Sequence, residues 1–229
     1  MECPLCGESA GRTWCEDRRR YVLCPSCGLI HVPSAERLDA SAEKARYDTH
    51  RNDPHDERYR QFMMRLAGPL PEQVPPGAEG LDFGSRPAAA LAMMLREQGR
   101  PTRAYDPYYA PDESVWQRQY DFIAASEVFE HLYRPGAELE RLLGVLRPGG
   151  VLAVMTSVAP ATADEFLAWH YVRDPTHVCF YRRDVFEYIA RRWGLTASFP
   201  AASVVLLRRG STRADTARSG SNRARAATT

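Results

Sequence analysis

Two copies of the pattern Cys-Pro-x-Cys-Gly lie within the first 28 residues, and they constrain the fold of this segment tightly. The first copy begins at Cys3 and the second at Cys24. Two thiolates three residues apart on a tight turn point at one metal ion, and two such turns complete a tetrahedral zinc site. A segment this short has little apolar core without such a cross-link. We therefore predict a zinc ribbon over residues 1–33, with these zinc ligands: Cys3, Cys6, Cys24 and Cys27.

Disulfides are the alternative for these four cysteines. The N-terminus lacks the basic start and the apolar stretch of a secretory signal. We therefore predict a cytoplasmic protein. Because disulfides are rare in the cytoplasm, we favour zinc for the four cysteines. The two remaining cysteines, Cys15 and Cys179, are expected to be ordinary thiols.

The charge balance argues against a large nucleic-acid footprint. The chain of 229 residues has a formal net charge of +1, and its tail, residues 210–229, carries four arginines and one aspartate. The rest is therefore slightly acidic, whereas proteins that hold long nucleic acids are usually basic. The segment Arg18 to Tyr21 could contact a phosphate, but we favour a solvated strand edge. We expect a small-molecule partner, with nucleic acid as the less favoured alternative.

Apolar residues are too scattered for a membrane span, because no apolar run approaches the ~20 residues that one requires. The tail contains no large apolar side chain and cannot bury enough surface to offset its ordering entropy. We predict that residues 210–229 are disordered. The sequence gives no indication of an oligomeric state.

Strands and helices alternate through residues 56–209, after a polar, helix-prone connector over residues 34–55. Apolar positions at three- and four-residue spacing predict helices, and short buried runs bounded by turn residues predict strands. This alternation indicates an α/β domain with a largely parallel sheet. The predicted helices cover residues 56–70, 87–98, 136–146 and 183–193, and the predicted strands cover residues 80–84, 102–105, 120–125, 151–156, 196–199 and 203–207.

Five short motifs follow one another through this domain. They are Leu81-Asp82-Phe83-Gly84, Tyr105-Asp106-Pro107, Tyr120-Asp121-Phe122-Ile123, Glu127-Val-Phe-Glu130-His131 and Leu146-Arg-Pro-Gly-Gly150. In this order and at this spacing they resemble the motifs of class I methyltransferases that use S-adenosylmethionine (SAM). The resemblance covers roughly residues 56 to 207. It implies a Rossmann-like sheet of seven strands, the last antiparallel, with helices on both faces and SAM over the carboxyl ends of the first two strands.

The resemblance also implies a set of cofactor contacts. Gly84 would allow the backbone to approach the cofactor, and the helix start beyond it would offer amides to the methionine carboxylate. Asp106 is placed like the acid that binds both ribose hydroxyls. Residues before the first strand, such as Asn52 and Tyr59, are further candidates for capping the cofactor. The predicted SAM-binding residues are Asp82, Gly84, Ser85, Arg86, Asp106 and Ser126.

One departure from the family pattern lies in this turn. The family usually has further glycines after the first, whereas here Ser85 and Arg86 follow Gly84. Pro87 suits the first turn of a helix, so the fold is expected to survive. Arg86 either pairs with the methionine carboxylate or crowds the pocket.

A cluster of acids and histidines follows the predicted strand 120–125. At helical spacing Glu127, Glu130 and His131 would share one face, and His177 is the later candidate in the polar, aromatic segment 169–181, which we expect to face the substrate. Such a set suits an oxygen-preferring divalent ion such as Mg²⁺. It resembles two metal-assisted groups, the ubiquinone-biosynthesis O-methyltransferases and the small-RNA 3′-terminal 2′-O-methyltransferases. The predicted divalent-ion ligands are Glu127, Glu130, His131 and His177, and the predicted catalytic residues are Glu130, His131 and His177.

Two other readings of this cluster stay open. Either histidine could act as a general base without a metal, and the acids could merely favour a helix start. Our expected activity is methyl transfer from SAM to a hydroxyl of a small or medium-sized metabolite. The alternatives are an RNA methyltransferase that holds RNA with its ribbon, and a degenerate SAM-fold adaptor, which Arg86 motivates.

Overall fold

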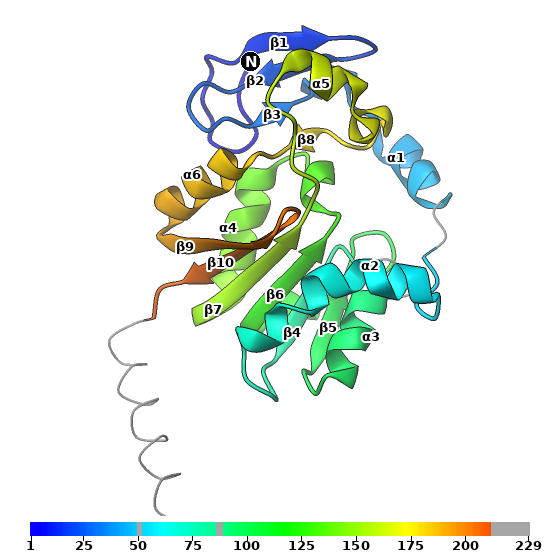
Figure 1. The fold of residues 1–229 in the computed structure, drawn as a ribbon, viewed down its shortest axis with the longest axis vertical. Coiled ribbons are helices and arrows are strands. Elements are labelled where there is room, and N and C mark those ends of the chain that lie inside the picture. The colour runs from blue at the N-terminus through cyan, green and yellow to red at the C-terminus, as the bar shows by residue number, and fades with distance from the viewer. Residues whose placement is uncertain (50–51, 86–88, 212–229) are drawn as a thin grey trace, which may run out of the picture.

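The strands of the main domain form one mixed sheet in a computed structural model that describes residues 1–49, 52–85 and 89–211. Arg86 and most of the predicted tail lie outside these residues. The strand order is β5-β4-β6-β7-β10-β9 (Figure 1). The bounds are β4 (Gly80–Phe83), β5 (Thr102–Tyr105), β6 (Tyr120–Ser126), β7 (Leu146–Met155), β9 (Leu195–Ala201) and β10 (Val204–Arg209).

Helices cover both faces of this sheet, as predicted. On one face, α2 (Glu57–Ala67) and α3 (Ala90–Glu97) pack in a core that includes Phe122 and Ala124 of β6. On the other, α4 (Pro135–Val145) and α6 (Arg183–Trp193) pack in a core that includes Ile123 and Ala125. This alternation is the two-residue period of a strand buried on both sides. The α/β architecture expected from the sequence is therefore present (Figure 1).

The helix ends follow from local sequence signals. The carboxylate of Asp56 accepts a hydrogen bond from the amide of Tyr59 at 2.9 Å and so caps α2. Pro135 occupies the first turn of α4, where a missing amide proton is tolerated. Gly194 ends α6 in the left-handed conformation, at φ 65°. None of the described helices combines the length and the apolar character that a membrane span needs.

The main sheet has six strands within the described residues, so the prediction of seven was wrong. The chain from β5 to β6 makes a bridge between Asp106 and Ala110 and then a short 3₁₀ helix, Glu113–Gln117. This connection is too short for the helix, strand and second helix that another parallel strand requires. The predicted antiparallel last strand is present, because β10 pairs antiparallel with β7.

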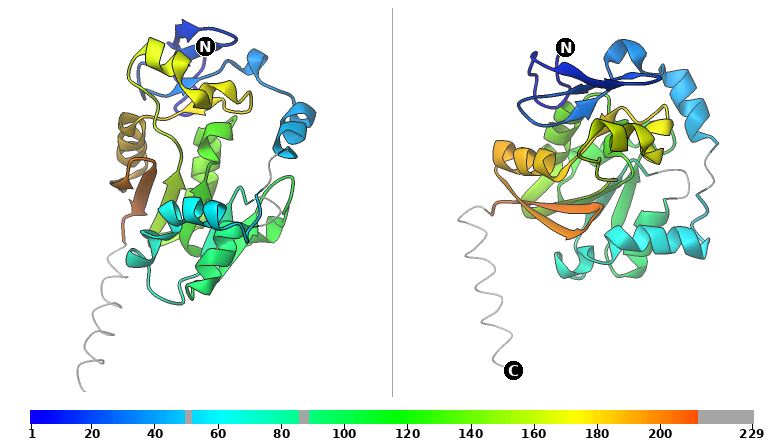
Figure 2. Two further views of the ribbon diagram at one scale, coloured as in Figure 1. Left: turned by 45° about the vertical axis from the view of Figure 1, so that its right-hand side comes forward. Right: turned by 45° about the horizontal axis from the view of Figure 1, so that its top comes forward.

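A second, four-stranded sheet caps the carboxyl edge of the first (Figure 2). Its first three strands come from the cysteine-rich segment: β1 (Arg12–Glu16), β2 (Arg20–Leu23) and β3 (Ile30–His31). The fourth is β8 (Cys179–Phe180), which pairs with β3 and comes from the main domain. The cysteine-rich cap, residues 1–33, which is called the ribbon below, therefore shares a sheet with the segment between β7 and α6.

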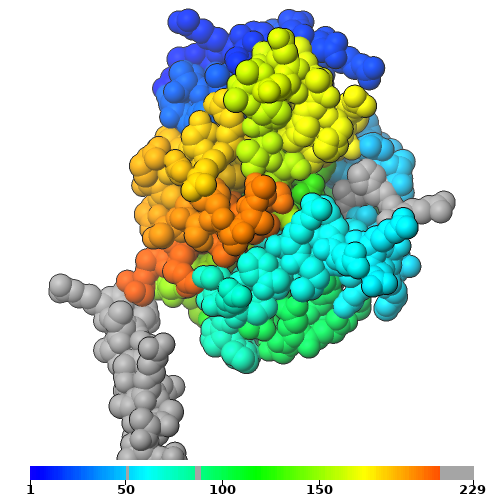
Figure 3. Space-filling model, viewed as in Figure 1, coloured from blue at the N-terminus to red at the C-terminus, as the bar shows by residue number. Residues whose placement is uncertain are grey.

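Two further segments pack beside the cap. The helix α5 (Ala163–Ala168) contacts β1, and the ring of Phe166 lies 5.2 Å from that of Trp14 and 4.9 Å from that of Tyr21. In the space-filling view these two parts meet without a visible gap (Figure 3). The connector forms a 3₁₀ turn (Ser34–Glu36) and α1 (Ala40–Tyr47), which lies beside the main domain (Figure 2).

Candidate active site

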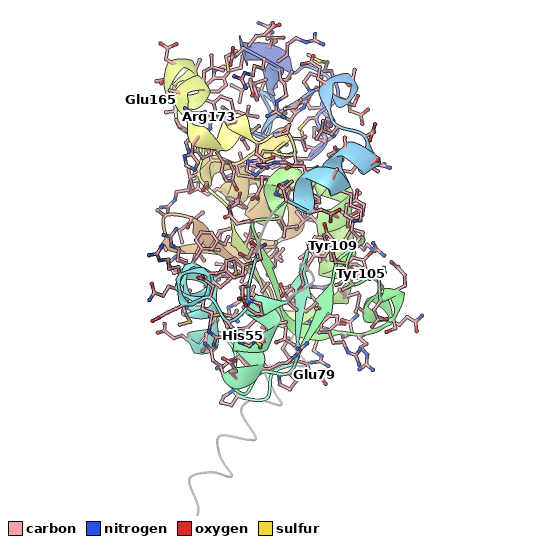
Figure 4. All side chains as sticks on the ribbon, turned by 90° about the vertical axis from the view of Figure 1, so that its right-hand side faces the viewer. His55, Glu79, Tyr105, Tyr109, Glu165 and Arg173 are labelled. Carbon is pink, nitrogen blue, oxygen red and sulfur yellow. The ribbon has the colours of Figure 1, made fainter. Side chains whose placement is uncertain are left out.

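Two adjoining cavities open at the carboxyl edge of β4, β5 and β6. Their volumes are about 420 Å³ and about 330 Å³, and Gly84, Glu127 and His131 line both. Open α/β sheets bind ligands at this edge. In Figure 4, Tyr105 and Tyr109 mark the side of the first cavity, and Glu79 marks the opposite end of the sheet.

The turn after β4 requires glycine. Gly84 has φ 78°, and a Cβ atom there would lie 2.4 Å from Cγ2 of Val128. The amides of Gly84 and Ser85 both donate to the carbonyl oxygen of Tyr105, at 2.8 and 3.0 Å. The turn is therefore as tight as predicted, but these two amides are used within the protein. The amides expected at the helix start fall partly on residues 86–88, which lie outside the described residues.

Asp82, in β4, connects the strand to the helix that follows the turn. It is buried, and its carboxylate accepts a hydrogen bond from the amide of Ala92 in the first turn of α3, at 3.1 Å. Burial raises the pKa of Asp82 to about 7. Asp82, Ser85 and Ser126 all line the second cavity, where the Ser126 hydroxyl donates to the sulfur of Met63 at 3.5 Å.

Asp106 lies on the wall of the first cavity. Its Oδ1 atom accepts hydrogen bonds from the amides of Tyr108 and Tyr109, at 2.8 and 3.0 Å, so the loop after β5 holds the carboxylate in place. The stacked rings of Phe83 and Tyr105 line the same cavity. An acid beside an aromatic wall gives this cavity both a hydrogen-bond acceptor and a flat apolar surface.

The helix α1 closes one side of the first cavity, which the sequence did not predict. The buried carboxylate of Glu43 accepts hydrogen bonds from the hydroxyls of Tyr47, at 3.0 Å, and Tyr108, at 2.7 Å. The hydroxyl of Tyr109 donates to Asp48 at 2.6 Å. The sequence signal was weak, because a polar connector helix shows no apolar face that identifies its partner.

Glu130 lies at the floor of the second cavity and is completely buried. Its carboxyl group accepts hydrogen bonds from the hydroxyls of Tyr171 and, at 2.9 Å, Thr156. Burial, reinforced by the neighbouring carboxyl of Glu127, raises the pKa of Glu130 to about 8. Tyr171 and Thr156 were not among the predicted site residues, because only the folded chain brings them to Glu130.

His131 and His177 face each other across the same cavity, with ring centroids 4.7 Å apart. The Nδ1 atom of His177 lies 2.8 Å from the carbonyl oxygen of Tyr171, and that of His131 lies 3.2 Å from the carbonyl oxygen of Thr176. A carbonyl oxygen can only accept, so we assign the proton of each neutral ring to Nδ1. The Nε2 atoms then carry the lone pairs that can bind a metal or a proton.

Three of the four predicted divalent-ion ligands come together. One donor atom each of Glu130, His131 and His177 lies within 4.8 Å of the others. Glu127 is not in this group, and the predicted common helical face was wrong. Glu127 has a left-handed φ of 53° and precedes a single 3₁₀ turn, Phe129–His131, so helical spacing does not apply to it.

The segment 169–181 faces the cavity only in part. His170, Tyr171, Asp174 and His177 line the second cavity, together with Asn52 and Tyr59, which precede the first strand of the main sheet. Residues 178–181 are instead buried and contain β8.

The four cysteines of the repeated pattern converge as predicted. Their sulfur atoms lie within 4.8 Å of one another, with Cys3 to Cys27 and Cys6 to Cys24 both at 3.5 Å. Gly7 and Gly28 have φ values of 80° and 76°, which the two tight turns require. Four thiols in this arrangement fit a tetrahedral zinc ion.

Comparison with known proteins identifies the main domain. Residues 47–197 match the family described as "Methyltransferase domain". This region contains every described residue that lines the two cavities except Glu43. A search of curated proteins found no match.

The search of solved structures gave matches at low sequence identity. An O-methyltransferase family protein from Burkholderia thailandensis is 16% identical, with a TM-score of 0.47, over 69% of this chain and 62% of that one. A putative sarcosine dimethylglycine methyltransferase from Galdieria sulphuraria is 15% identical, with a TM-score of 0.48, over 69% and 76%. The match thus spans less than two thirds of the Burkholderia protein. Since the family match covers well over half of the sequence, the chain belongs to the methyltransferase-domain family.

Proposed function

We propose that this protein transfers the methyl group of SAM to a hydroxyl of a small or medium-sized metabolite, at the junction of the two cavities. The observation that carries the proposal is the shared lining of the cavities. The first offers Asp106 and an aromatic wall for a nucleoside, and the second offers the polar cluster of Glu130, His131 and His177. His131 lines both cavities, so this cluster borders the space where a methyl group would pass.

The chemistry needs the acceptor hydroxyl to lose a proton. The acceptor oxygen forms a bond to the methyl carbon of SAM while the carbon–sulfur bond breaks, and the sulfur keeps that electron pair. We assign the Nε2 atom of His131 as the group that takes the proton; the contact of its Nδ1 atom with the carbonyl oxygen of Thr176 supports this assignment. Positioning the two reactants in adjoining cavities supplies the entropic part of the rate enhancement.

The residues present also fit a divalent ion. Glu130, His131 and His177 would hold it, and it would supply Lewis acidity that lowers the pKa of the acceptor hydroxyl. This is an alternative to general-base catalysis by His131, because an Nε2 atom bound to the ion could not also take the proton, which would then pass to solvent. With Glu127 outside the group, the donor set is one carboxylate and two imidazoles. Imidazole suits Mn²⁺, Fe²⁺, Co²⁺ or Zn²⁺ better than Mg²⁺, so we propose a transition metal in place of the Mg²⁺ that the sequence favoured. We also propose structural zinc at the four cysteines.

Calorimetry of SAM binding tests this proposal. We expect wild-type protein to bind SAM with a dissociation constant in the range of about 1 µM to 1 mM. Asp106→Ala removes a charged hydrogen-bond acceptor and should weaken binding by about tenfold or more. Asp112→Ala is the matched control, because Asp112 is exposed in the same loop and lines neither cavity; it caps the following 3₁₀ turn and lies 3.7 Å from Arg103. Absence of SAM binding by the wild type, with and without Mn²⁺, would refute the proposal.

Two contacts of the ribbon favour a small acceptor over RNA. In the basic segment, Arg19 donates to backbone carbonyls of the main domain and Arg20 pairs with Glu36. Arg18 is the exposed member of the three. A surface that holds RNA presents its cations to phosphates, so we expect no salt-sensitive RNA binding.

A further inference from the structure

The turn between β1 and β2 of the ribbon contacts a loop of the main domain through one side chain, Arg19. Its guanidinium group donates to four backbone carbonyl oxygens of residues more than 150 positions away in the sequence. These are Val172 at 3.0 Å, Asp174 at 3.2 Å, Pro175 at 2.9 Å and His177 at 3.1 Å. Four backbone carbonyl groups of the loop 172–177 therefore converge on one cation.

A guanidinium group suits this task because its donors lie in a fixed plane and stay charged at all accessible pH values. Hydrogen bonds from a charged donor are stronger than those between neutral groups. The ring of Tyr21 lies 5.6 Å from the guanidinium carbon and adds a cation–π contact. Arg19 is therefore held from the ribbon side while it holds the loop.

The same loop orients both histidines of the candidate active site. The carbonyl oxygen of Tyr171, next to Val172, faces Nδ1 of His177, and the carbonyl oxygen of Thr176 faces Nδ1 of His131. These two contacts direct the Nε2 atoms of both rings. A change in the path of residues 171–177 would therefore move both imidazoles together.

Backbone pairing ties the end of this loop to the ribbon and to the site. The amide of Val32, next to β3, donates to the carbonyl of Val178, and the amide of Val178 donates to the carbonyl of Glu130, at 2.9 and 2.8 Å. On the other side, Arg46 of α1 pairs with Asp174 at 2.8 Å. The loop is thus held from three directions: Arg46 binds the side chain of Asp174, whereas Arg19 binds the backbone carbonyls along the loop. Figure 4 labels Arg173, in this segment, below Glu165 of α5 and to the side of the cysteine-rich strands.

We propose that Arg19 is a positioning residue and that the ribbon supports the acceptor site from outside, by fixing the path of the loop 172–177. The catalytic part of this inference rests on the proposed function, because the loop affects catalysis only if His131 and His177 act there. Its physical content, the dependence of the loop and of both imidazoles on Arg19, stands on the contacts alone.

Hydrogen exchange and histidine NMR on the full-length protein test the inference. We compare Arg19→Ala with Arg18→Ala, a matched control in the same turn whose side chain is exposed. We expect Arg19→Ala to speed amide exchange in residues 170–178 by about tenfold or more, because opening of this loop no longer breaks charged hydrogen bonds. The ¹⁵N resonances of His131 and His177 should shift, while exchange in β4 and β6 stays unchanged. Arg18→Ala should match the wild type in every measurement.

A conservative variant separates positioning from a general loss of structure. Lysine keeps the charge but has a compact ammonium that cannot span four carbonyls. Arg19→Lys should therefore fold, keep the thiol-bound metal content of the wild type, and still show the histidine shifts and faster exchange of residues 170–178. Unchanged exchange and unchanged histidine resonances in both Arg19 variants would overturn the inference. Neither readout needs SAM or an acceptor, so failure of the proposed function would appear separately, as absence of SAM binding.

Discussion

The hydroxyl of Tyr171 donates a hydrogen bond to the carboxyl group of Glu130 and also lies 3.2 Å from a carboxyl oxygen of Glu127. A phenol has one proton, so it can donate to only one of the two acids at a time. Burial raises the pKa of both acids, which favours a protonated carboxyl that supplies the second hydrogen bond. Tyr171 thus links the acids on the floor of the second cavity.

Removing this hydroxyl should destabilise the protein. Tyr171→Phe leaves buried carboxyl oxygens without a donor, which costs about 1–3 kcal/mol. Tyr109→Phe is the control, because its hydroxyl donates to an exposed carboxylate, and we expect a change within about 0.5 kcal/mol. Urea unfolding measures both. Equal stability of Tyr171→Phe and the wild type would show that this hydrogen bond contributes nothing.

Gly84 and Gly77 form a matched pair for the cofactor turn. Both have positive φ values, 78° and 80°, but only at Gly84 would a Cβ atom clash, with Val128. Gly77→Ala should cost about 1–2 kcal/mol from backbone strain alone. Gly84→Ala should cost about 1–3 kcal/mol more and should weaken SAM binding at least about tenfold. Thermal unfolding and SAM calorimetry give the comparison, and similar losses of SAM affinity in both variants would contradict it.

Glu130 and Glu127 should differ in metal binding. Glu130→Gln keeps the size and the neutral character of the protonated acid, so we expect the fold to persist, but an amide is a poor metal ligand. We expect Mn²⁺ binding, followed by electron paramagnetic resonance, to weaken about tenfold or more. Glu127→Gln should change Mn²⁺ affinity little, because Glu127 lies outside the three-residue group. An equal loss in both variants would restore Glu127 as a ligand.

His31 should make the stability of the protein fall in mild acid. The ring is 1% exposed, and neither nitrogen has a hydrogen-bond partner of good geometry among the described residues. Burial lowers the pKa of His31 from 6.5 to about 4. The unfolded chain therefore binds this proton at a higher pH than the folded protein. Above pH 6.5 this group does not lower the free energy of unfolding. As the pH falls from 6.5 towards 4, it lowers the free energy of unfolding by about 2–3 kcal/mol.

Replacement of His31 isolates this effect from acid release of metal. His31→Leu should remove the extra loss of stability between pH 6.5 and 4, whereas His55→Leu, at an exposed position before α2, should keep it. Urea unfolding across this pH range, at equal thiol-bound metal content, gives the difference. Identical pH profiles for His31→Leu and the wild type would contradict the lowered pKa.

Local patterns were enough for most elements and for the location of the site. Periodicity predicted the strands 102–105 and 120–125 within one residue, and the helix 183–193 without error. The motifs at Gly84, Asp106 and Glu130 reach one edge of the sheet because parallel strands joined by crossovers all end there. The tight turns of the two cysteine pairs are likewise short-range features. None of these depends on knowing which distant surfaces meet.

Only the tertiary structure decided how the parts combine. The contact of Arg19 with the loop 172–177, the pairing of β3 with β8 and the position of α1 over the first cavity all join segments far apart in the sequence. The exclusion of Glu127 from the metal group has the same origin, because its backbone conformation is set by the junction of β6 with the following turn. Sequence periodicity indicates which face of an element is buried. Which other element covers that face depends on how the whole chain packs.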